Sequence, residues 1–320
     1  MKVHSRRAAP NTARAEPAAT YLRKNKLCPH NPVLSSKQRH GLMNNSLALN
    51  VPQSSPVLTP YRVALVDVVA GLQAFDIWGR LGWRETRRRY RRTAFGPFWT
   101  TVSLMLIIAP LGFVWSNLWH KDLTTYLPYL TSGMIFWIFI SGICTEGCPS
   151  FLAYEKLIKQ LRISYTLLAC AVVWRNTVVL FHNVIIYVLV CVVCGIFPTW
   201  NTLLCLPGLA LLCLNLVWVV IVLGTLCARY RDLQQLVAHV LQISMFLTPI
   251  FWTPDQLTGR MATVAEFNPL YHLIAIVRNP LLGAAPTELN WLAAILIAAV
   301  GWTTAVLMLT KLRHRIVYWL

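Results

Sequence analysis

Polar side chains inside the long apolar runs of this chain are the first candidates for chemistry. An ionisable or polar group surrounded by apolar sequence is a functional candidate by default, although a hydrogen bond between helices, worth about 1 kcal/mol or less, is the competing explanation. On a helix, Ser244 points away from His239 and Gln242, so these three do not form one cluster. The candidates are His182, Asn183, Asn215, His239, Gln242 and Ser244.

Short catalytic motifs are absent from the sequence. It contains no GxxxxGK[ST], HExxH or GxSxG run, so we expect no nucleotide hydrolysis by this chain and no catalytic residue. Only Glu146 comes close to the mid-membrane acid that proton-driven carriers use. The sequence therefore predicts no enzyme and no cofactor, and energy supplied by a partner. A membrane-embedded transferase is the alternative, but His182, His239 and His272 have no acidic partner nearby in the sequence.

The nine cysteines mostly lie within apolar runs, including the pairs Cys144 and Cys148 and Cys191 and Cys194. A zinc site needs deprotonated thiolates with a polar second shell, which a lipid-facing helix disfavours. We therefore expect these cysteines to be small apolar side chains, and we predict no metal site.

Composition places the chain in a membrane. Apolar residues make up 56% of it and charged residues only 12%, which is typical of a protein whose solvent is largely lipid. The net charge of +18 resides in the first hundred residues and in short segments between apolar runs. That distribution follows the positive-inside rule, so nucleic-acid binding is not expected.

The N-terminal part changes character near residue 60. Residues 1–60 are basic and rich in Pro, Asn and Ser, and such a composition predicts disorder. A transit peptide, or a start at Met43, remain alternatives. Residues 61–97 are expected to form an amphipathic helix in the membrane interface, because apolar positions at helical spacing precede a basic stretch with Trp78 and Trp83.

A span needs about 20 mostly apolar residues, and residues 98–320 are expected to hold six of them. The predicted fold is therefore an all-α polytopic membrane protein with an interfacial N-terminal helix. Lys and Arg concentrate in alternate loops, which together with the even number of spans puts both termini in the cytoplasm. The predicted spans are 98–118, 130–150, 174–197, 203–227, 235–253 and 289–310.

The segment between the fifth and sixth spans is too apolar for a free loop and too interrupted for a span. We expect two short helices at the external interface, at the mouth of a translocation path. Pro249 lies near the outer end of the fifth span and predicts a kink or break there, although a proline can also be tolerated. Aromatic residues in the external half indicate an interfacial belt, and a lining on which sugars stack is the alternative.

The loop FLAYEKLIKQLRISY, after the second span, is basic and helical in pattern. Its apolar residues fall on one side and its lysines elsewhere. This pattern fits either a helix on the bilayer surface or one that docks into a groove of a soluble partner.

Four stretches resemble the polysaccharide-export permeases of ABC transporters, over about residues 65–320. LGWRETRRRYRRTAFGPFW at 81–99 is similar to the stretch before that family's first span, except that Glu85 stands where Asp is more usual. The other three are VWRNTVVLFHN at 173–183, ARYRDLQQLVAHVLQISMFLTPIFW at 228–252 and EFNPLYHLIAIVRNPLLG at 266–283.

The resemblance implies a permease that exports lipid-linked polysaccharide, such as O-antigen of lipopolysaccharide or capsule, across the bacterial inner membrane. It implies a homodimer, a separate ABC ATP-binding subunit and contact with membrane lipids. A permease for a small lipid or drug is the nearest alternative, and it would lack the RYRD and NPLYH stretches.

The resemblance also assigns candidate site residues. A coupling helix at about 153–164, which drifts from the family's pattern near 160–164, offers Tyr154, Glu155, Lys156 and Lys159. Arginines suit the linker's pyrophosphate, with ordinary headgroup binding as the alternative; they are Arg84, Arg87, Arg88 and Arg91. The expected external gate residues are Asn268, Tyr271, His272 and Arg278. The expected channel aromatics are Trp115, Phe136, Trp137 and Trp252.

Overall fold

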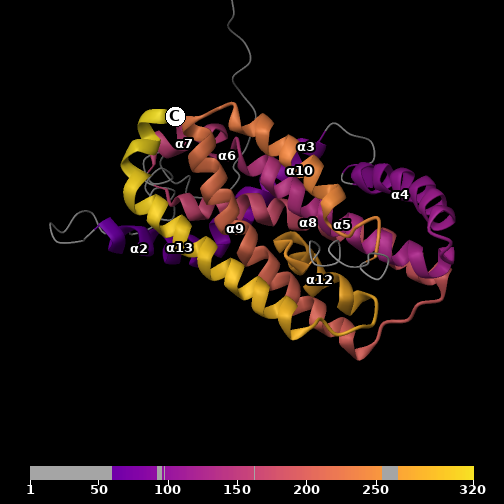
Figure 1. Cartoon of the computed structure of the whole chain (residues 1–320). Coiled ribbons are helices and arrows are strands. Elements are labelled where there is room, and N and C mark those ends of the chain that lie inside the picture. The colour runs from indigo at the N-terminus through magenta and orange to yellow at the C-terminus, as the bar shows by residue number, and fades with distance from the viewer. Residues whose placement is uncertain (1–59, 92–95, 97, 162, 254–265) are drawn as a thin grey trace, which may run out of the picture. The chain divides into compact units, whose positions relative to one another are not determined.

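The computed structural model describes residues 60–91, 96, 98–161, 163–253 and 266–320. Every regular element in these ranges is a helix (Figure 1). The predicted disordered extension, residues 1–60, lies almost wholly outside the described residues. So does most of the segment in which the first of the two external helices was expected.

Five helical stretches are long and apolar enough to cross a membrane. They confirm a polytopic all-α membrane protein. The first has the bounds that the sequence predicted. The five are α4 (Phe98–Leu118), α5 (Leu123–Gly147), α8 (Tyr165–Cys194), η1 (Trp200–Leu204) continuing into α9 (Cys205–Arg229), and α13 (Glu288–Trp319).

Two spans begin earlier than predicted because polar residues in their first turns have hydrogen-bond partners elsewhere in the protein. α5 begins at Leu123 rather than near 130; the Tyr126 hydroxyl near its start donates to a backbone carbonyl 125 residues further along the chain, at 2.6 Å. α8 begins at Tyr165 rather than near 174; Thr166 in its first turn donates to Asp67 at 3.3 Å. Polar side chains with partners inside the protein do not end a span.

The fifth predicted span, 235–253, corresponds to α10 (Leu233–Leu247) and the residues after it. α10 ends before Pro249, with Thr248 extended (φ −85°, ψ 136°), as expected for a residue that precedes proline. The predicted break is therefore present. Fifteen residues rise only about 22 Å as a helix, less than the roughly 30 Å hydrocarbon core. α10 alone does not form a sixth span.

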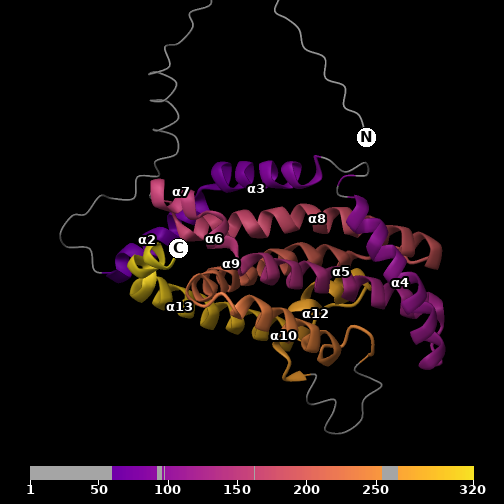
Figure 2. The same cartoon turned by 90° about the horizontal axis from the view of Figure 1, so that it is seen from above.

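The predicted amphipathic segment is two helices, α2 (Pro60–Gln73) and α3 (Phe75–Tyr90), which meet at Ala74. α2 packs against α8 and α13, and α3 runs along α8 (Figure 2). A Cβ at Gly71 would lie 2.6 Å from the Ser164 Oγ, and one at Gly82 would lie 2.9 Å from the Ala171 carbonyl oxygen. Glycine at both sites therefore allows the close approach to α8.

α5 is the central helix, and it contacts α4, α8, α9, α10 and α12 (Pro269–Leu281). Of its most apolar 18-residue window, 72% is buried, against 22% in α4. After α5 the chain forms two short helices, α6 (Ser150–Ala153) and α7 (Glu155–Gln160). α5 thus connects the 150–160 loop with the opposite end of the bundle.

Candidate functional site

The end of α5 nearest α6 carries a network of ion pairs with α3 and α8. Glu146 accepts hydrogen bonds from Arg175 Nε and Nη2 at 3.0 and 2.6 Å, from Asn176 Nδ2 at 2.7 Å and from Arg89 Nη1 at 2.5 Å. Arg175 also pairs with Glu85. We call these five residues the α5 ion-pair network.

Charge is balanced in this network, with two carboxylates facing two guanidinium groups. The side chains of Glu146 and Arg175 are 17% and 14% exposed, so the energetic consequence of losing one partner is large. Breaking a buried pair from one side leaves an uncompensated charge and costs about 3–5 kcal/mol. The network therefore fixes α3 to α5 and α8 as one unit.

Sequence reasoning noted Glu146 and Glu85 singly but missed their connection. The partners lie 57 and 90 residues apart in the sequence, beyond the reach of helical periodicity. The available signal was the isolated charge of Glu146 and of Arg175, each within a largely apolar run.

The predicted coupling residues lie on the short helices after α5. Tyr154, between α6 and α7, is buried; burial and then the adjacent Glu85 raise the pKa of its phenol. Glu155 accepts from Lys159 Nζ at 2.7 Å, and this hydrogen bond holds the pKa of Glu155 below its ordinary value. Lys156 and Lys159 are exposed. The structure thus turns Tyr154 inward and leaves the two lysines at the surface.

The predicted linker-binding arginines share one exposed face of α3, because they recur at three- and four-residue intervals. None of the four makes an ion pair with any described residue. Arg89, on the opposite face, was not predicted and is the arginine that binds Glu146. We call the exposed set the α3 arginine stripe; it comprises Arg84, Arg87, Arg88 and Arg91.

At the far end of α5, non-helical residues 248–253 follow α10, and we call them the break. Tyr126 donates to the Phe251 carbonyl at 2.6 Å. Tyr129 donates to the carbonyls of Pro249 and Trp252 at 3.0 and 3.1 Å. Irregular backbone at membrane depth persists only where protein groups satisfy it, and the tyrosines of α5 do so here.

α12 holds the same break from its other side. The Asn268 side chain caps α12 by accepting from the Leu270 amide at 2.9 Å, and its Nδ2 donates to Thr248 Oγ1 at 3.0 Å. Arg278 Nη1 donates to the Pro249 carbonyl at 2.6 Å, and its guanidinium lies 4.2 Å from the centre of the Tyr129 ring.

Arg278 is 2% exposed and forms no ion pair with any acid among the described residues. Its Nε is buried without a hydrogen-bond partner in the same part of the chain. A carbonyl dipole and an aromatic face offset only part of the cost of burying a guanidinium. This end of α5 therefore carries an incompletely compensated charge.

The other two predicted gate residues contact different groups. His272 is buried; its Nδ1 lies 2.8 Å from Asn290 Oδ1 on α13, and its Nε2 lies 2.6 Å from the Glu266 carbonyl oxygen. Tyr271 is half-buried beside the His272 ring. Asn268 and Arg278 thus hold the break, while His272 joins α12 to α13. That these residues form a gate stays a prediction.

The predicted channel aromatics fall into two pairs. Trp115 stacks on Phe251 of the break with ring centres 5.9 Å apart, and the Trp252 indole donates to the Phe246 carbonyl at 3.1 Å. Phe136 and Trp137 are buried in the packed core. The structure brings Trp115 and Trp252 to the break and keeps Phe136 and Trp137 away from any open surface of the single chain.

Most of the polar candidates within the apolar runs fall into two groups, one that makes hydrogen bonds between helices and one that is exposed. Asn183 accepts from Thr101 of α4 at 3.3 Å, and Asn215 donates to the Ala294 carbonyl of α13 at 3.2 Å. These two make hydrogen bonds between helices. His239 and Gln242, on α10, are exposed. Indeed no residue of α10 is buried, so α10 has faces that the single chain does not cover.

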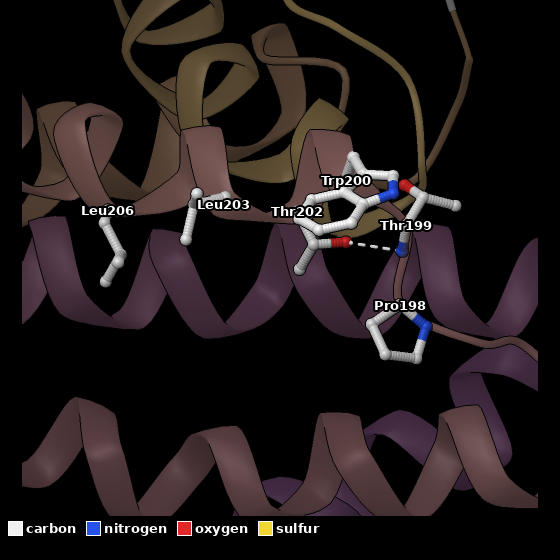
Figure 3. A pocket seen from close by; sticks show the side chains of 6 residues that line it. All are labelled: Pro198, Thr199, Trp200, Thr202, Leu203 and Leu206. Carbon is white, nitrogen blue, oxygen red and sulfur yellow. Dashed lines mark hydrogen bonds between the residues drawn. The ribbon is translucent and has the colours of Figure 1, made fainter.

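The turn between α8 and α9 carries an apolar hollow of about 450 Å³ lined by Pro198, Trp200 and Leu206 among others (Figure 3). The Thr199 amide donates to Thr202 Oγ1 at 3.1 Å and shapes the turn. Trp200 is 93% exposed. Exposed tryptophan beside apolar residues at the end of two spans is typical of a membrane interface.

Comparison with known proteins identifies a family to which this chain is similar. The model of the ABC-2 type transporter family matches residues 78–282. The chain is 20% identical over 246 residues to the O-antigen export system permease protein RfbA of Klebsiella pneumoniae, covering 75% of this chain and 93% of that protein. It is 22% identical to the Myxococcus xanthus protein of the same name, covering 60% and 74%.

Proposed function

Because this chain belongs to the ABC-2 type transporter family, we propose that it is the permease of an exporter for lipid-linked polysaccharide. The O-antigen permeases to which it is similar support this cargo, O-antigen or capsule. A separate ATP-binding subunit supplies the energy, since the sequence has no phosphate-binding GxxxxGK[ST] run. The complex lies in the bacterial inner membrane, with both termini in the cytoplasm.

The observation that carries the proposal is the uncovered polar face of α10. Gln235, His239 and Gln242 are exposed at four- and three-residue spacing and so share one face of an otherwise apolar helix. Polar groups at membrane depth face a protein partner or water rather than lipid. This face of α10 suits the wall of a hydrated path.

Two copies of the chain enclose that path. The faces of α10 beside the polar one are apolar and equally exposed, with Leu236, Val240 and Ile243 on them. A second copy that packs against these residues buries them and leaves the polar face lining the path. α10 and the break together then act as the sixth crossing in each copy.

Lipid-linked cargo enters at the cytoplasmic interface and leaves past the break. The α3 arginine stripe presents guanidinium groups that form no ion pair with the described residues and that match phosphate geometry, and so binds the linker's pyrophosphate and nearby lipid headgroups. At the external end, α12 closes the mouth through Asn268 and Arg278. Trp115 and Trp252 flank the sugar path beside the break, and Phe136 and Trp137 border it only after α5 moves.

α5 transmits the force of ATP hydrolysis. The ATP-binding subunit contacts Glu155, Lys156 and Lys159 on α7, while Tyr154 passes the movement inward toward Glu85. The α5 ion-pair network moves with it, and the tyrosines at the far end of α5 pull on the break.

The test is surface polysaccharide in cells whose only permease is a variant of this chain. His239→Leu with Gln242→Leu makes the lining apolar, and we expect at least about a tenfold loss of surface polysaccharide at unchanged protein level. Gln234→Leu, which makes the same polar-to-apolar change at an exposed residue on another face of α10, is the matched control. Unchanged surface polysaccharide in the first variant would contradict the path along α10, and export of a small lipid instead would favour the alternative cargo.

A further inference from the structure

Three segments that are far apart in the sequence meet beside α7. α7 packs against the end of α13, and both views place that end next to α7 (Figures 1 and 2). The loop after α9 is close as well, since α9 packs against α6, the short helix that precedes α7. Lys159 has the largest effect in holding the pKa of Glu155 low, and the positive charge of Arg231 contributes to it.

Arg229 joins the loop to α13. Its guanidinium carbon lies 5.1 Å from the centre of the Tyr230 ring and 5.2 Å from that of Trp319. Both distances are within the range of cation–π attraction. The loop and the last turn of α13 are therefore held together.

The last turns of α13 are also fastened to α2. Arg313 Nη2 lies 3.0 Å from Asp67 Oδ1, and its Nη1 donates to the Val63 carbonyl at 3.3 Å. Asp67 is fully buried. A helix end held at Arg313 and again at Trp319 presents its outward side chains in a fixed position.

The outward side chains are the types that dominate protein interfaces. Tyr318 is 88% exposed and Tyr230 is 52% exposed. The backbone that carries them is nevertheless held in place by the contacts of Arg229 and Arg313. Tyr and Arg are enriched among residues that carry most of the binding energy, because they offer a large rigid area with polar ends. We call this set, which is net basic, the α7–α13 surface; it comprises Lys156, Lys159, Tyr230, Arg231 and Tyr318.

We infer that the ATP-binding subunit docks on the whole α7–α13 surface, rather than on α7 alone. This inference rests on the proposed function. The surface includes the α7 lysines, to which the proposed function already assigns this partner, and its basic charge calls for acidic groups on the partner's face. A bilayer also attracts basic and aromatic groups, and the experiment separates the two.

The experiment measures the Kd between the separately purified cognate ATP-binding subunit and the permease held in lipid nanodiscs. The variants are Tyr318→Ala, which removes a side chain that is almost fully exposed, and Arg231→Glu. The control is Trp200→Ala, an exposed aromatic residue at the other end of the spans. Each permease is measured in zwitterionic and in anionic lipid, at low and high salt.

Tyr318→Ala is expected to raise the Kd about tenfold in both lipids. Arg231→Glu is expected to raise it more at low salt than at high salt, because salt screens exposed charges. A Kd within twofold of wild type for both variants would overturn the inference, as would weakening confined to anionic lipid, which assigns the surface to the bilayer. If the wild-type permease itself binds no ATP-binding subunit, the proposed function fails and this inference fails with it.

Discussion

The two ends of α5 both bury charge, and they compensate it differently. Near α6, Glu146 accepts hydrogen bonds from Arg175, Arg89 and Asn176, and every charge in the network has an opposite charge beside it. At the far end, the buried Arg278 has a carbonyl and the Tyr129 ring but no acid within the described residues.

This difference indicates that one end of α5 is fixed in place, whereas the contacts of Arg278 at the other end, which we call the latch, can open. The balanced network is costly to open, so α3, α5 and α8 are expected to move as one body. The contacts of Arg278 are individually weaker, and its charge gains solvation when the site opens. The same helix therefore connects a fixed end to an end that can release.

The largest expected effect is the loss of a charge from the fixed end. Arg175→Met leaves Glu85 without its partner and removes two donors from Glu146, and we expect the free energy of unfolding to fall by about 3–5 kcal/mol. Thermal unfolding of the detergent-purified protein measures it. Arg88→Met is the control, because Arg88 is exposed and forms no ion pair in the part of the chain that the structure describes. Equal melting temperatures for the two variants would show that the α5 ion-pair network does not stabilise this end.

Replacing Arg278 at the latch is expected to cause a smaller loss of stability, together with leakage of small solutes through the protein. Arg278→Met removes one charge-assisted hydrogen bond worth about 1.5–3 kcal/mol but also relieves an uncompensated charge, so the net destabilisation is smaller than for Arg175→Met. Proteoliposomes without the ATP-binding subunit should release a small trapped dye faster than wild type. Arg278→Lys, which keeps the charge but loses the stacking, should leak less. Tight vesicles with Arg278→Met would show that the latch is not at Arg278.

Asp67 is intermediate between the balanced network and the uncompensated Arg278. It is fully buried, and Arg313 is its ion-pair partner among the described residues. Burial raises the pKa of Asp67 despite Arg313 and the hydroxyls of Ser164 and Thr166. Because the folded protein binds this proton more tightly than the unfolded chain does, the contribution of Asp67 to stability grows as pH falls through its raised pKa.

The pH dependence is tested against Asp67→Asn. The melting temperature of wild type relative to this variant should rise between neutral pH and about pH 4, by roughly 2–4 °C for each kcal/mol gained. A wild-type advantage that instead shrinks toward low pH would mean that the Arg313 pair outweighs burial.

The smallest effect on stability is expected at the exposed Glu155–Lys159 pair. Surface pairs contribute little, so Lys159→Ala should leave the melting temperature unchanged. The same change should lower the affinity for the ATP-binding subunit, which a pull-down at matched concentrations measures. Lost stability with intact binding would make α7 a structural element instead.

Continuous apolar sequence predicted the spans well, and polar interruptions limited the prediction. α4 has the predicted bounds, and the break after α10 followed from Pro249. The starts of α5 and α8 were placed too late, because the partners of Tyr126 and Thr166 are visible only in three dimensions. The ion-pair network was missed for the same reason, whereas the α3 arginine stripe follows from local spacing.

The most direct test of the proposed permease is where lipid-linked polysaccharide resides when this chain is removed. In a strain that lacks the chain, we expect polysaccharide to disappear from the cell surface while its lipid-linked form accumulates at the inner leaflet. Restoring wild type should reverse both changes, and His239→Leu with Gln242→Leu should not. Surface polysaccharide that persists without the chain, with no accumulation inside, would contradict the account.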